Sequence, residues 1–404
     1  MTKPRILSIS TLFPSPARPA FGTFVANQMR AVAARGDVEL TMIDPVGTPP
    51  WPLSRREPYR SLRMMPEQSD TAGIPTWHPR FTLIPKLGGD SNPARIARAV
   101  LPLARRLHAE RPFALVDAQF FFPDGPAAAI VARELGLPLT IKARGSDIHY
   151  WGNRPHALKQ MLAAAGQAAG MLAVSQAMRK DMIALGMPED RIFVHYTGLD
   201  RDRFRPMERQ AARKLVSALP ALGIRSQGPL IVTPGSLIAI KGQRLAIAAL
   251  AHLPDATLAL AGTGEDEAEL RAQAERLGIG ERVRFLGQLS HDLLPHLLSA
   301  ADVMVLPSER EGLANVWVET LACGTPIVIP DIGGAREVVA APSAGRIVAR
   351  TPEAIAGAVR EILKNPPSQA EVAANAERFS WEANAAHLVE FWRDCVERRA
   401  SPLA

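Results

Sequence analysis

The chain has 404 residues, of which 47% are hydrophobic and 22% charged, a composition typical of a soluble globular protein too long for one ordinary core. No stretch approaches the roughly 20 consecutive apolar residues of a membrane-spanning helix, and the two distant cysteines, Cys323 and Cys395, argue against a disulfide scaffold or a cysteine-ligated metal. The formal net charge of +7 favours polyanionic partners without choosing among phosphorylated substrates, anionic membranes and nucleic acid.

The first half of the chain alternates short apolar runs with longer stretches of helical spacing. Buried strands are predicted at residues 5–10, 38–43, 114–118, 139–143 and 171–174. Helices are predicted at residues 24–35, 126–135 and 176–185, and Ser175 is placed to cap the last of them. The start of the chain carries charge, but its apolar run is short and interrupted by Ser and Pro, so it predicts a first strand and its loop, not a secretory signal. Residues 47–75 and 77–90 contain too many Pro and Gly interruptions for a regular assignment.

The second half repeats this alternation more regularly. Its strands are predicted at residues 230–233, 257–261, 282–286, 303–306 and 327–329, with helices at 243–251, 265–277 and 291–300 and a last helix at 381–398. Such alternation indicates parallel sheets with helices on both faces. We therefore predict an α/β protein of two doubly wound domains, residues 1–205 and 206–380, followed by a helical segment at 381–404. The junction is expected within residues 204–228, a polar stretch interrupted by proline and glycine.

Two glutamates follow a predicted strand in the stretch PSEREGLANVWVETLACGTP, residues 307–326. A helix is expected to begin near Leu313 or Ala314, so the turn before it lies where doubly wound sheets bind ligands. The N–H groups of that helix start suit a phosphate, and the carboxylates of Glu311 and Glu319 suit pairs of sugar hydroxyls. The alternative for a bare pair of acids is that Glu311 caps the helix and Glu319 is a solvated surface charge.

Two glycine-containing loops follow earlier strands. In TPGSLIAIKGQRLAIAAL, Gly235 permits a tight turn and Lys241 is placed to neutralise a phosphate above the sheet, although an ordinary surface lysine is the alternative. In AGTGE, residues 261–265, Gly262 and Gly264 would allow a ligand to approach the backbone closely. This loop lacks the full spacing of a dinucleotide-binding fingerprint.

The order of these motifs resembles the C-terminal domain of the retaining glycosyltransferases of family 4, which have the GT-B fold. The motifs that carry the resemblance, from residue 230 to about residue 339, are GSL…KG, AGTGE, VRFLGQL, ADVMVLPS, E-x7-E and ACGTPIV. Weaker likenesses are TGLDRDRFRP, the segment that leads into the linker, and FSWEANAAHLVEFW, the closing helix that in this fold crosses back onto the N-terminal domain. In the first half, RGSDI resembles the HGSD-type loop of the family.

The resemblance implies two Rossmann-like domains facing a cleft, with a nucleotide sugar as donor substrate, no cofactor and no metal. Glu319 would bind the ribose hydroxyls, Glu311 the hydroxyls of the transferred sugar, and Lys241 the diphosphate. The residues implied on the donor side are Glu319, Gly312, Leu313, Ala314, Gly235, Ser236, Gly262, Gly264 and Gln288. The catalytic residues implied are Glu311, Lys241 and Arg144.

Two positions depart from the family pattern. Ser236 stands where the family commonly has arginine, so Lys241 would carry the phosphate charge alone or with Arg144. Arg144 itself stands where the family commonly has histidine, which argues against a catalytic histidine at that position. His149 is the alternative candidate, and a structural or solvated histidine is the other interpretation of that residue.

The first domain would supply the acceptor site, with Gly22, Asp147 and His149 on that side. Gly22 lies between the first strand and the first helix, where close approach to a ligand is expected. Two arginine-rich stretches, residues 51–65 and 94–112, interleave cations with apolar side chains as surfaces that bind anionic lipid headgroups do. The alternative is a solvated surface of an Arg-rich protein. We therefore expect a cytoplasmic enzyme, peripheral at the inner face of the cell membrane, that acts on a carbohydrate or lipid-linked acceptor.

Other interpretations are weaker. In a different glycosyltransferase fold, a D-x-D sequence holds a metal ion. Here the D-x-D sequence Asp200-Arg201-Asp202 predicts a turn and a helix start capped by Asp200, so metal-independent transfer is expected. A nicotinamide-dependent dehydrogenase lacks its glycine fingerprint. Nucleic acid is not expected as a partner, because aromatic residues make up only 5% of the chain and no binding motif is present. A sugar-nucleotide epimerase or a phosphorylase on the same fold remains the nearest alternative.

Overall fold

The computed structural model describes residues 3–19, 21–71, 73–85, 88–290 and 292–400, which fall into two compact units. Unit 1 comprises Met1–Gly198 together with Trp381–Ala404, and unit 2 comprises Leu199–Ser380. The division at residues 198–199 lies ahead of the stretch where the sequence placed the junction, and that stretch contains helix α7 (Arg209–Ser217).

Unit 1 is built on an eight-stranded sheet in the order β10-β9-β8-β7-β1-β2-β5-β4. Its strands are β1 (Arg5–Ile9), β2 (Glu39–Ile43), β4 (Gln68–Thr71), β5 (Ile74–Trp77), β7 (Leu115–Ala118), β8 (Leu139–Lys142), β9 (Gly170–Ala173) and β10 (Ile192–Val194). All neighbouring pairs are parallel except the hairpin of β4 and β5 at one edge. In the central strand, Ile6 lies opposite Leu40 of β2 and Leu115 of β7. The five strands predicted for this half are confirmed.

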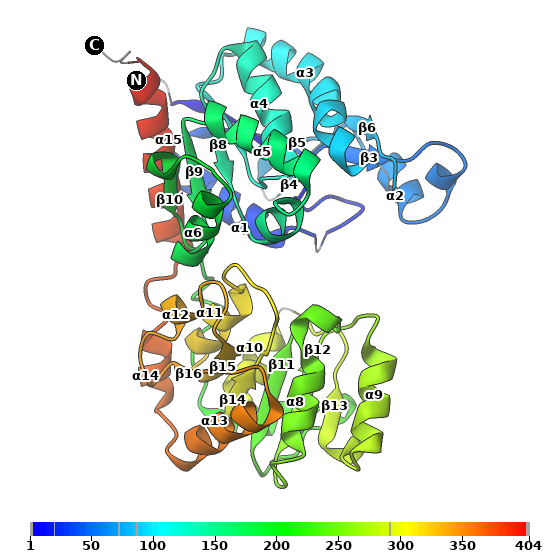
Figure 1. The fold of residues 1–404 in the computed structure, drawn as a ribbon, viewed down its shortest axis with the longest axis vertical. Coiled ribbons are helices and arrows are strands. Elements are labelled where there is room, and N and C mark those ends of the chain that lie inside the picture. The colour runs from blue at the N-terminus through cyan, green and yellow to red at the C-terminus, as the bar shows by residue number, and fades with distance from the viewer. Residues whose placement is uncertain (1–2, 20, 72, 86–87, 291, 401–404) are drawn as a thin grey trace. The chain divides into compact units, whose positions relative to one another are not determined.

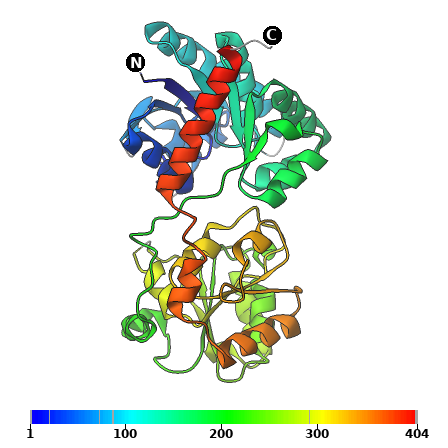
Figure 2. The same ribbon diagram turned by 90° about the vertical axis from the view of Figure 1, so that its left-hand side faces the viewer.

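Helices cover both faces of this sheet, as the βα alternation predicts. Helices α3 (Asn92–Glu110), α4 (Asp124–Leu135) and α5 (Pro155–Gln167) lie together on one face, and α1 (Thr23–Arg35) and α15 (Trp381–Ala400) lie on the other (Figure 1). Helix α6 (Gln176–Ala184) begins as predicted, because the Ser175 side chain accepts a hydrogen bond from the Met178 N–H. Figure 2 shows α15, in red, lying along unit 1, where its buried Leu388 and Trp392 join the core formed by α1 and the sheet.

The two stretches left without a regular assignment form a small substructure of unit 1. Strands β3 (Val46–Thr48) and β6 (Arg80–Thr82) pair in parallel, and between them lie a 3-10 turn (Leu53–Arg55), helix α2 (Tyr59–Arg63) and the β4–β5 hairpin. The segment that carries α2 projects from the rest of the unit (Figure 1). These elements are short, so their sequence carries too few periods of a helix or strand pattern to be recognised.

Unit 2 contains a six-stranded, entirely parallel sheet in the order β13-β12-β11-β14-β15-β16. Its strands are β11 (Leu230–Pro234), β12 (Thr257–Ala261), β13 (Val283–Phe285), β14 (Val303–Val305), β15 (Ile327–Pro330) and β16 (Gly345–Val348). Its helices besides α7 are α8 (Gln243–Leu250), α9 (Glu267–Arg276), α10 (Leu294–Ala300), α11 (Asn315–Ala322), α12 (Ala335–Val338), α13 (Pro352–Lys364) and α14 (Gln369–Ala374). The helix predicted at residues 291–300 begins at Leu294, and His291 lies outside the described residues. The predicted alternation is confirmed, and both halves are doubly wound.

Candidate active site

The strand order of unit 2 reverses between β11 and β14, which are neighbours in the centre of the sheet. From β11 the chain moves outward to β12 and β13, and from β14 it moves outward in the opposite direction. The loops that follow β11 and β14 therefore turn away from each other, and such a switch point is where open α/β sheets bind ligands.

A cavity of about 370 Å³ opens at this edge of the sheet. It is lined by residues that follow β11, β12, β13 and β14, by the start of α10 and by the first two turns of α11. The lining residues are Pro234, Gly235, Ser236, Lys241, Ala261, Gly262, Thr263, Gln288, Leu289, Leu294, Leu306, Val316 and Glu319. The structure therefore brings together six residues predicted from the sequence: Gly235, Ser236, Lys241, Gly262, Gln288 and Glu319.

Lys241 and Glu311 form an ion pair beside this cavity. Lys241 ends the 3-10 turn after β11, Glu311 lies in the loop after β14, and their Nζ and Oε1 atoms are 2.6 Å apart. Their side chains are 25% and 12% exposed, so solvent screens the pair only in part. An ammonium group has three N–H donors, so Lys241 keeps donors for a further acceptor when one is given to Glu311.

Glu319 lies in the second turn of α11 and presents its half-buried side chain to the cavity. Within the described part of the chain, no hydrogen bond or ion pair reaches its carboxylate, and burial raises the pKa of Glu319 to about 7. A fully solvated surface charge does not fit this half-buried position. A half-buried carboxylate without a partner, facing a cavity, is suited to accept hydrogen bonds from ligand hydroxyls.

The loop that joins Glu311 to α11 is held by backbone contacts. The Gly312 carbonyl accepts a 2.8 Å hydrogen bond from the Gly334 N–H, Leu313 is buried, and Ala314 occupies the N-cap position of α11. The expected start of the helix is confirmed to within one residue. The cavity is lined by Val316 and Glu319, which follow this loop in the sequence. It is not lined by the four predicted loop residues, Glu311, Gly312, Leu313 and Ala314.

Close contacts between two loops require glycine at both positions of the AGTGE loop, and this requirement was not predicted from the sequence. A Cβ atom on Gly262 would lie 2.0 Å from the Gly235 carbonyl oxygen, and one on Gly264 would lie 2.1 Å from the Leu237 carbonyl oxygen. These contacts between the loops after β11 and β12 require glycine whether or not a ligand is near. Gly235, by contrast, lies in the wall of the cavity. Its backbone φ is 140°, and a Cβ atom there would meet open space.

In unit 1, Arg144 follows β8 and is held by the chain after β7. Its Nε donates to the Gln119 carbonyl at 2.7 Å, its Nη2 donates to Gln119 Oε1 at 2.6 Å, and its guanidinium lies over the Phe24 ring. Burial lowers the pKa of Arg144 to about 10, which leaves it charged at neutral pH. Arg144 is therefore a fixed cation at the carboxyl edge of the unit 1 sheet.

The three residues predicted on the acceptor side have structural partners. Asp147 is buried and accepts hydrogen bonds from the backbone N–H groups of Phe121, Arg144, Gly145 and Ile148. This contradicts a direct acceptor contact, because its carboxylate serves to fold the loop. The His149 Nε2 lies 2.9 Å from Asp181 Oδ2, within the same unit.

The local structure likewise requires glycine at position 22. It caps α1 with φ of 68°, and a Cβ atom there would lie 2.4 Å from the Leu12 carbonyl oxygen. Glycine is therefore required by the turn between β1 and α1, whether or not a ligand is near.

A buried polar network behind Arg144 was not predicted. Lys142 Nζ donates to Gln28 Oε1 at 2.7 Å and lies 2.7 Å from His195 Nδ1, while His195 Nε2 lies 2.9 Å from the Asn384 carbonyl. Because a carbonyl only accepts, His195 Nε2 carries the hydrogen and Nδ1 accepts from Lys142. Burial lowers the pKa values of Lys142 and His195.

Asp117 supplies the negative charge of this network. Its carboxylate accepts hydrogen bonds from Ser8, Gln119, Thr140 and Trp392. The only sequence signals for the network were polar residues inside apolar strands, as in LVDA and LTIK.

The D-x-D sequence forms a turn, as predicted, because Asp200 Oδ1 accepts from the Arg203 N–H at 3.1 Å. The predicted helix start is wrong, since the next helix begins at Arg209. Proline at position 206 lacks the N–H donor that a continuing helix needs. Across the described residues, no group of His, Cys, Asp and Glu is arranged to hold a metal ion, and no helix is both long and apolar enough to cross a bilayer.

Both halves of the chain match the models of known families. Residues 218–379 match the family model described as Glycosyl transferases group 1. Residues 22–203 match the model described as Glycosyltransferase Family 4. The two matches cover most of unit 2 and most of unit 1, respectively.

Similar proteins include bacterial glycosyltransferases. The chain is 28% identical over 341 residues to the protein named "Putative teichuronic acid biosynthesis glycosyltransferase TuaC" of Bacillus subtilis. This alignment covers 82% of each of the two chains. It is 32% identical over 240 residues to the D-inositol 3-phosphate glycosyltransferase of Xylanimonas cellulosilytica, and this alignment covers 57% of the chain and 58% of the relative.

Solved structures share the fold of the whole chain. Anabaena HepE, crystallised in complex with UDP, superposes with a TM-score of 0.70 at 22% identity, covering 99% of this chain and 100% of HepE. Sucrose-phosphate synthase from Thermosynechococcus elongatus superposes with a TM-score of 0.74 at 21% identity, with the same coverage.

Proposed function

The chain belongs to the group 1 glycosyltransferases and has the GT-B fold, and on this premise we propose that it moves a sugar from a nucleoside diphosphate sugar to an acceptor hydroxyl with retention of anomeric configuration. The observation that carries the proposal is the cavity at the switch point of unit 2, with the unpartnered Glu319 in its wall and the Lys241–Glu311 pair beside it.

The donor is proposed to bind with its nucleotide in this cavity. HepE was crystallised with UDP and also with UDP-glucose, which supports a nucleotide sugar as the class of donor. In this proposal, Glu319 accepts hydrogen bonds from the ribose hydroxyls. Gln288 and the loop after β13 lie beside the base.

The diphosphate would lie near Lys241, with the sugar toward Glu311. In the reaction, the bond between the anomeric carbon and the diphosphate oxygen breaks, and a bond to the acceptor oxygen forms on the same face of the sugar. Negative charge grows on the leaving diphosphate, so the ammonium of Lys241 stabilises the transition state more than the ground state. The acceptor proton leaves with the diphosphate, and the products are a glycoside and a nucleoside diphosphate.

Arg144 is proposed to act from unit 1 as a second fixed cation, and the loop folded by Asp147 sets its backbone. No metal is invoked, because Lys241 and the N–H groups at the start of α11 can carry the phosphate charge. The nucleotide sugar is a substrate, and no cofactor is proposed.

We further propose that the acceptor is a carbohydrate or lipid-linked glycan in the assembly of a surface polysaccharide or glycolipid, at the inner face of the cell membrane. The name of the Bacillus subtilis relative, which refers to teichuronic acid biosynthesis, supports this class of acceptor. The net charge of +7 supports attraction to an anionic surface.

The test is to incubate the protein with a panel of nucleotide sugars, with and without lipid-linked and soluble glycan acceptors. We expect nucleoside diphosphate release that requires an acceptor, and nuclear magnetic resonance should show the donor's anomeric configuration in the product. An epimerase would change the donor sugar without any acceptor, and a phosphorylase would require inorganic phosphate. Either result, or an inverted product, would refute the proposed reaction.

A further inference from the structure

Residues 51–64 of unit 1 expose apolar side chains next to arginines. Trp51 is 73% exposed, Leu53 43% and Met64 78%, all on the segment of α2 that projects from the unit (Figure 1). Large side chains of this kind are usually buried, and three of them grouped on one projection mark an interaction surface.

The same segment carries four arginines, at positions 55, 56, 60 and 63, against one glutamate, Glu57. Arg60 lies 3.5 Å from Glu57, but Arg55, Arg56 and Arg63 have no ion-pair partner in the described part of the chain. Their charges are therefore available to an external anion.

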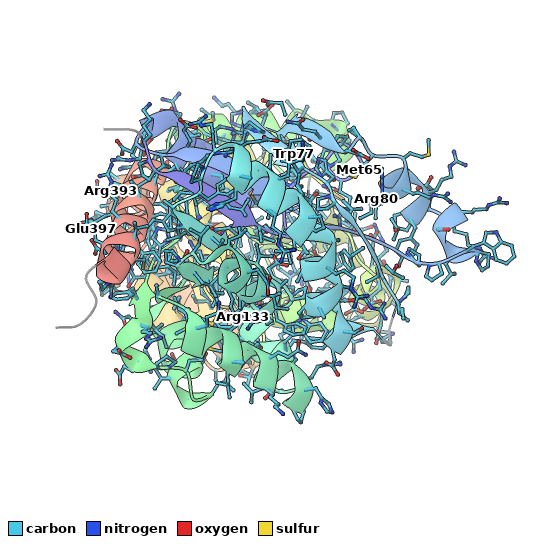
Figure 3. The ribbon with its side chains drawn as sticks, turned by 90° about the horizontal axis from the view of Figure 1, so that it is seen from above. Met65, Trp77, Arg80, Arg133, Arg393 and Glu397 are labelled. Atoms are coloured by element: carbon cyan, nitrogen blue, oxygen red, sulfur yellow. The ribbon has the colours of Figure 1, made fainter. Side chains whose placement is uncertain are left out.

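The projection is firmly attached at its base. Leu62 and Met65 are buried against Val46 of β3, and the Arg80 Nη2 donates to the Met65 carbonyl from β6. Figure 3 shows Met65 and Arg80 where the projection meets the rest of unit 1. The exposed side chains are thus presented by a segment with its own small core.

The second arginine-rich stretch, in α3, differs both in the exposure of its apolar residues and in the pairing of its arginines. Its apolar residues Ile96, Val100 and Leu107 are buried against the unit, so none of these is available to a membrane. Three of the arginines in α3 are engaged: Arg95 donates to the Thr82 carbonyl, Arg105 lies 2.6 Å from Glu134, and Arg106 lies 3.7 Å from Glu110. Of the two stretches singled out in the sequence, the structure therefore favours only residues 51–64.

We infer that residues 51–64 form a docking surface for an anionic lipid membrane, into which Trp51, Leu53 and Met64 insert while Arg55, Arg56 and Arg63 bind lipid phosphates. Tryptophan is favoured at the membrane interface, because its ring is apolar and its N–H is polar. Arginine keeps its guanidinium among the headgroups while its stem covers apolar surface. A protein partner would match the apolar residues, but three unpaired cations beside them match a uniformly anionic surface better.

The inference deepens the membrane association proposed above, and its test needs neither donor nor acceptor. Full-length protein is sedimented with vesicles of phosphatidylcholine alone and with vesicles that contain an equal part of phosphatidylglycerol, at low and high salt. We expect the wild type to bind only the anionic vesicles and to be released by salt. Failure of this binding leaves the glycosyltransferase assay unaffected, so the two proposals fail separately.

Two variants divide the surface into its parts. Trp51→Ser/Met64→Ser removes the inserting side chains, and Arg55→Gln/Arg56→Gln/Arg63→Gln removes the free cations. Each is expected to weaken binding to anionic vesicles by at least about tenfold. All the substituted positions are exposed, so both variants should keep the wild-type melting temperature.

The matched control is Arg98→Gln/Arg105→Gln/Arg106→Gln on α3, which removes the same number of charges and should change binding by less than about twofold. Wild-type protein that remains in the supernatant with anionic vesicles at low salt overturns the inference. So does a folded 51–64 variant that sediments as the wild type does, or an equal loss of binding in the α3 control.

Discussion

Lys241 Nζ lies 2.6 Å from Glu311 Oε1, so an ion pair joins the loops that follow the two central strands of the unit 2 sheet, beside the 2.7 Å hydrogen bond from the Glu309 N–H to the Ile240 carbonyl. The pair therefore contributes to the separation of these loops beside the cavity in which we place the donor diphosphate.

The first prediction concerns the strength of this pair. Lys241→Met and Glu311→Gln should each destabilise the protein, because the partner left behind is a partly buried, unpaired group. A double-mutant cycle on the free energy of unfolding in urea should give a coupling energy of about 1–2 kcal/mol. The exposed i,i+4 pair Arg271–Glu267 is the control, with an expected coupling of about 0.3–0.5 kcal/mol. Equal couplings for the two pairs would show that the contact at the cavity is only a surface pair.

The second prediction concerns donor use. Lys241→Ala and Glu319→Ala should each reduce kcat/KM for the donor by an amount equivalent to about 2–4 kcal/mol, since one removes a phosphate contact and the other a buried hydroxyl contact. Both variants should remain folded. Glu281→Ala, exposed and at the opposite, amino end of the strands, should leave the rate unchanged. Near-normal turnover in a folded Lys241 or Glu319 variant would mean that the donor binds elsewhere.

The third prediction is a pH dependence of stability. Burial raises the pKa of Glu319 to about 7 in the folded protein from its ordinary value of 4.5. Between these pH values the folded state holds one more proton than the unfolded state, so the free energy of unfolding falls as pH rises through that window. Glu319→Gln does not titrate and should therefore be more stable than the wild type above pH 7, by up to roughly 3 kcal/mol.

Urea unfolding of the two proteins at a series of pH values measures this effect. Burial also raises the pKa of Asp124 to about 7, so Asp124 contributes the same trend to both proteins. The difference between variant and wild type isolates Glu319. A constant difference from pH 5 to about pH 8 would contradict the raised pKa.

Some of the fold was predictable from the sequence, and the reason is burial. Strands such as β11 and β12 are buried throughout, so their apolar runs were recognised to within one residue. Strand β16 lies at the edge of the unit 2 sheet, three of its four residues are half-buried, and it was not recognised. Helix α7 was missed because the pattern of a short, highly charged helix resembles that of a linker.

The candidate site was predictable where a motif lies in one continuous stretch. Glu319 and Lys241 were identified by their places after predicted strands together with the resemblance to the family motifs, and the structure places both on one cavity. The role of Asp147 was not predictable, because its four N–H donors come from two separate loops. The Lys142–His195 contact joins two strand ends that are far apart in the sequence, so no local pattern could indicate it.

The fourth prediction is that transfer does not require a divalent metal. Turnover should be unchanged by excess chelator and by added magnesium or manganese, because the diphosphate charge is assigned to Lys241 and the start of α11. The Asp200→Asn/Asp202→Asn variant should behave as the wild type does. Two results together would show that the D-x-D sequence binds a metal. Activity would be lost on chelation and restored by manganese, and the Asp200→Asn/Asp202→Asn variant would be inactive even with manganese.

The last prediction concerns the attachment of α15 to unit 1. Trp392 lies in α15, and its Nε1 donates to Asp117 Oδ1 at 3.1 Å inside the core. Four donors converge on the Asp117 carboxylate, and asparagine would offer one acceptor oxygen and an NH2 group that faces donors. The charge of Asp117 also opposes the effect of burial on the Lys142 pKa, and this would be lost.

We therefore expect Asp117→Asn to lower the free energy of unfolding of unit 1 by about 2–4 kcal/mol, and Trp392→Phe to lower it by about 1–3 kcal/mol. The measurement is hydrogen exchange of the α15 amides together with urea unfolding. Trp51→Phe is the matched control, since Trp51 is largely exposed and its substitution should change stability by less than about 0.5 kcal/mol. If Asp117→Asn leaves the exchange of α15 at the wild-type rate, the network does not hold the helix, and the apolar contacts of Leu388 and its neighbours are sufficient to attach it.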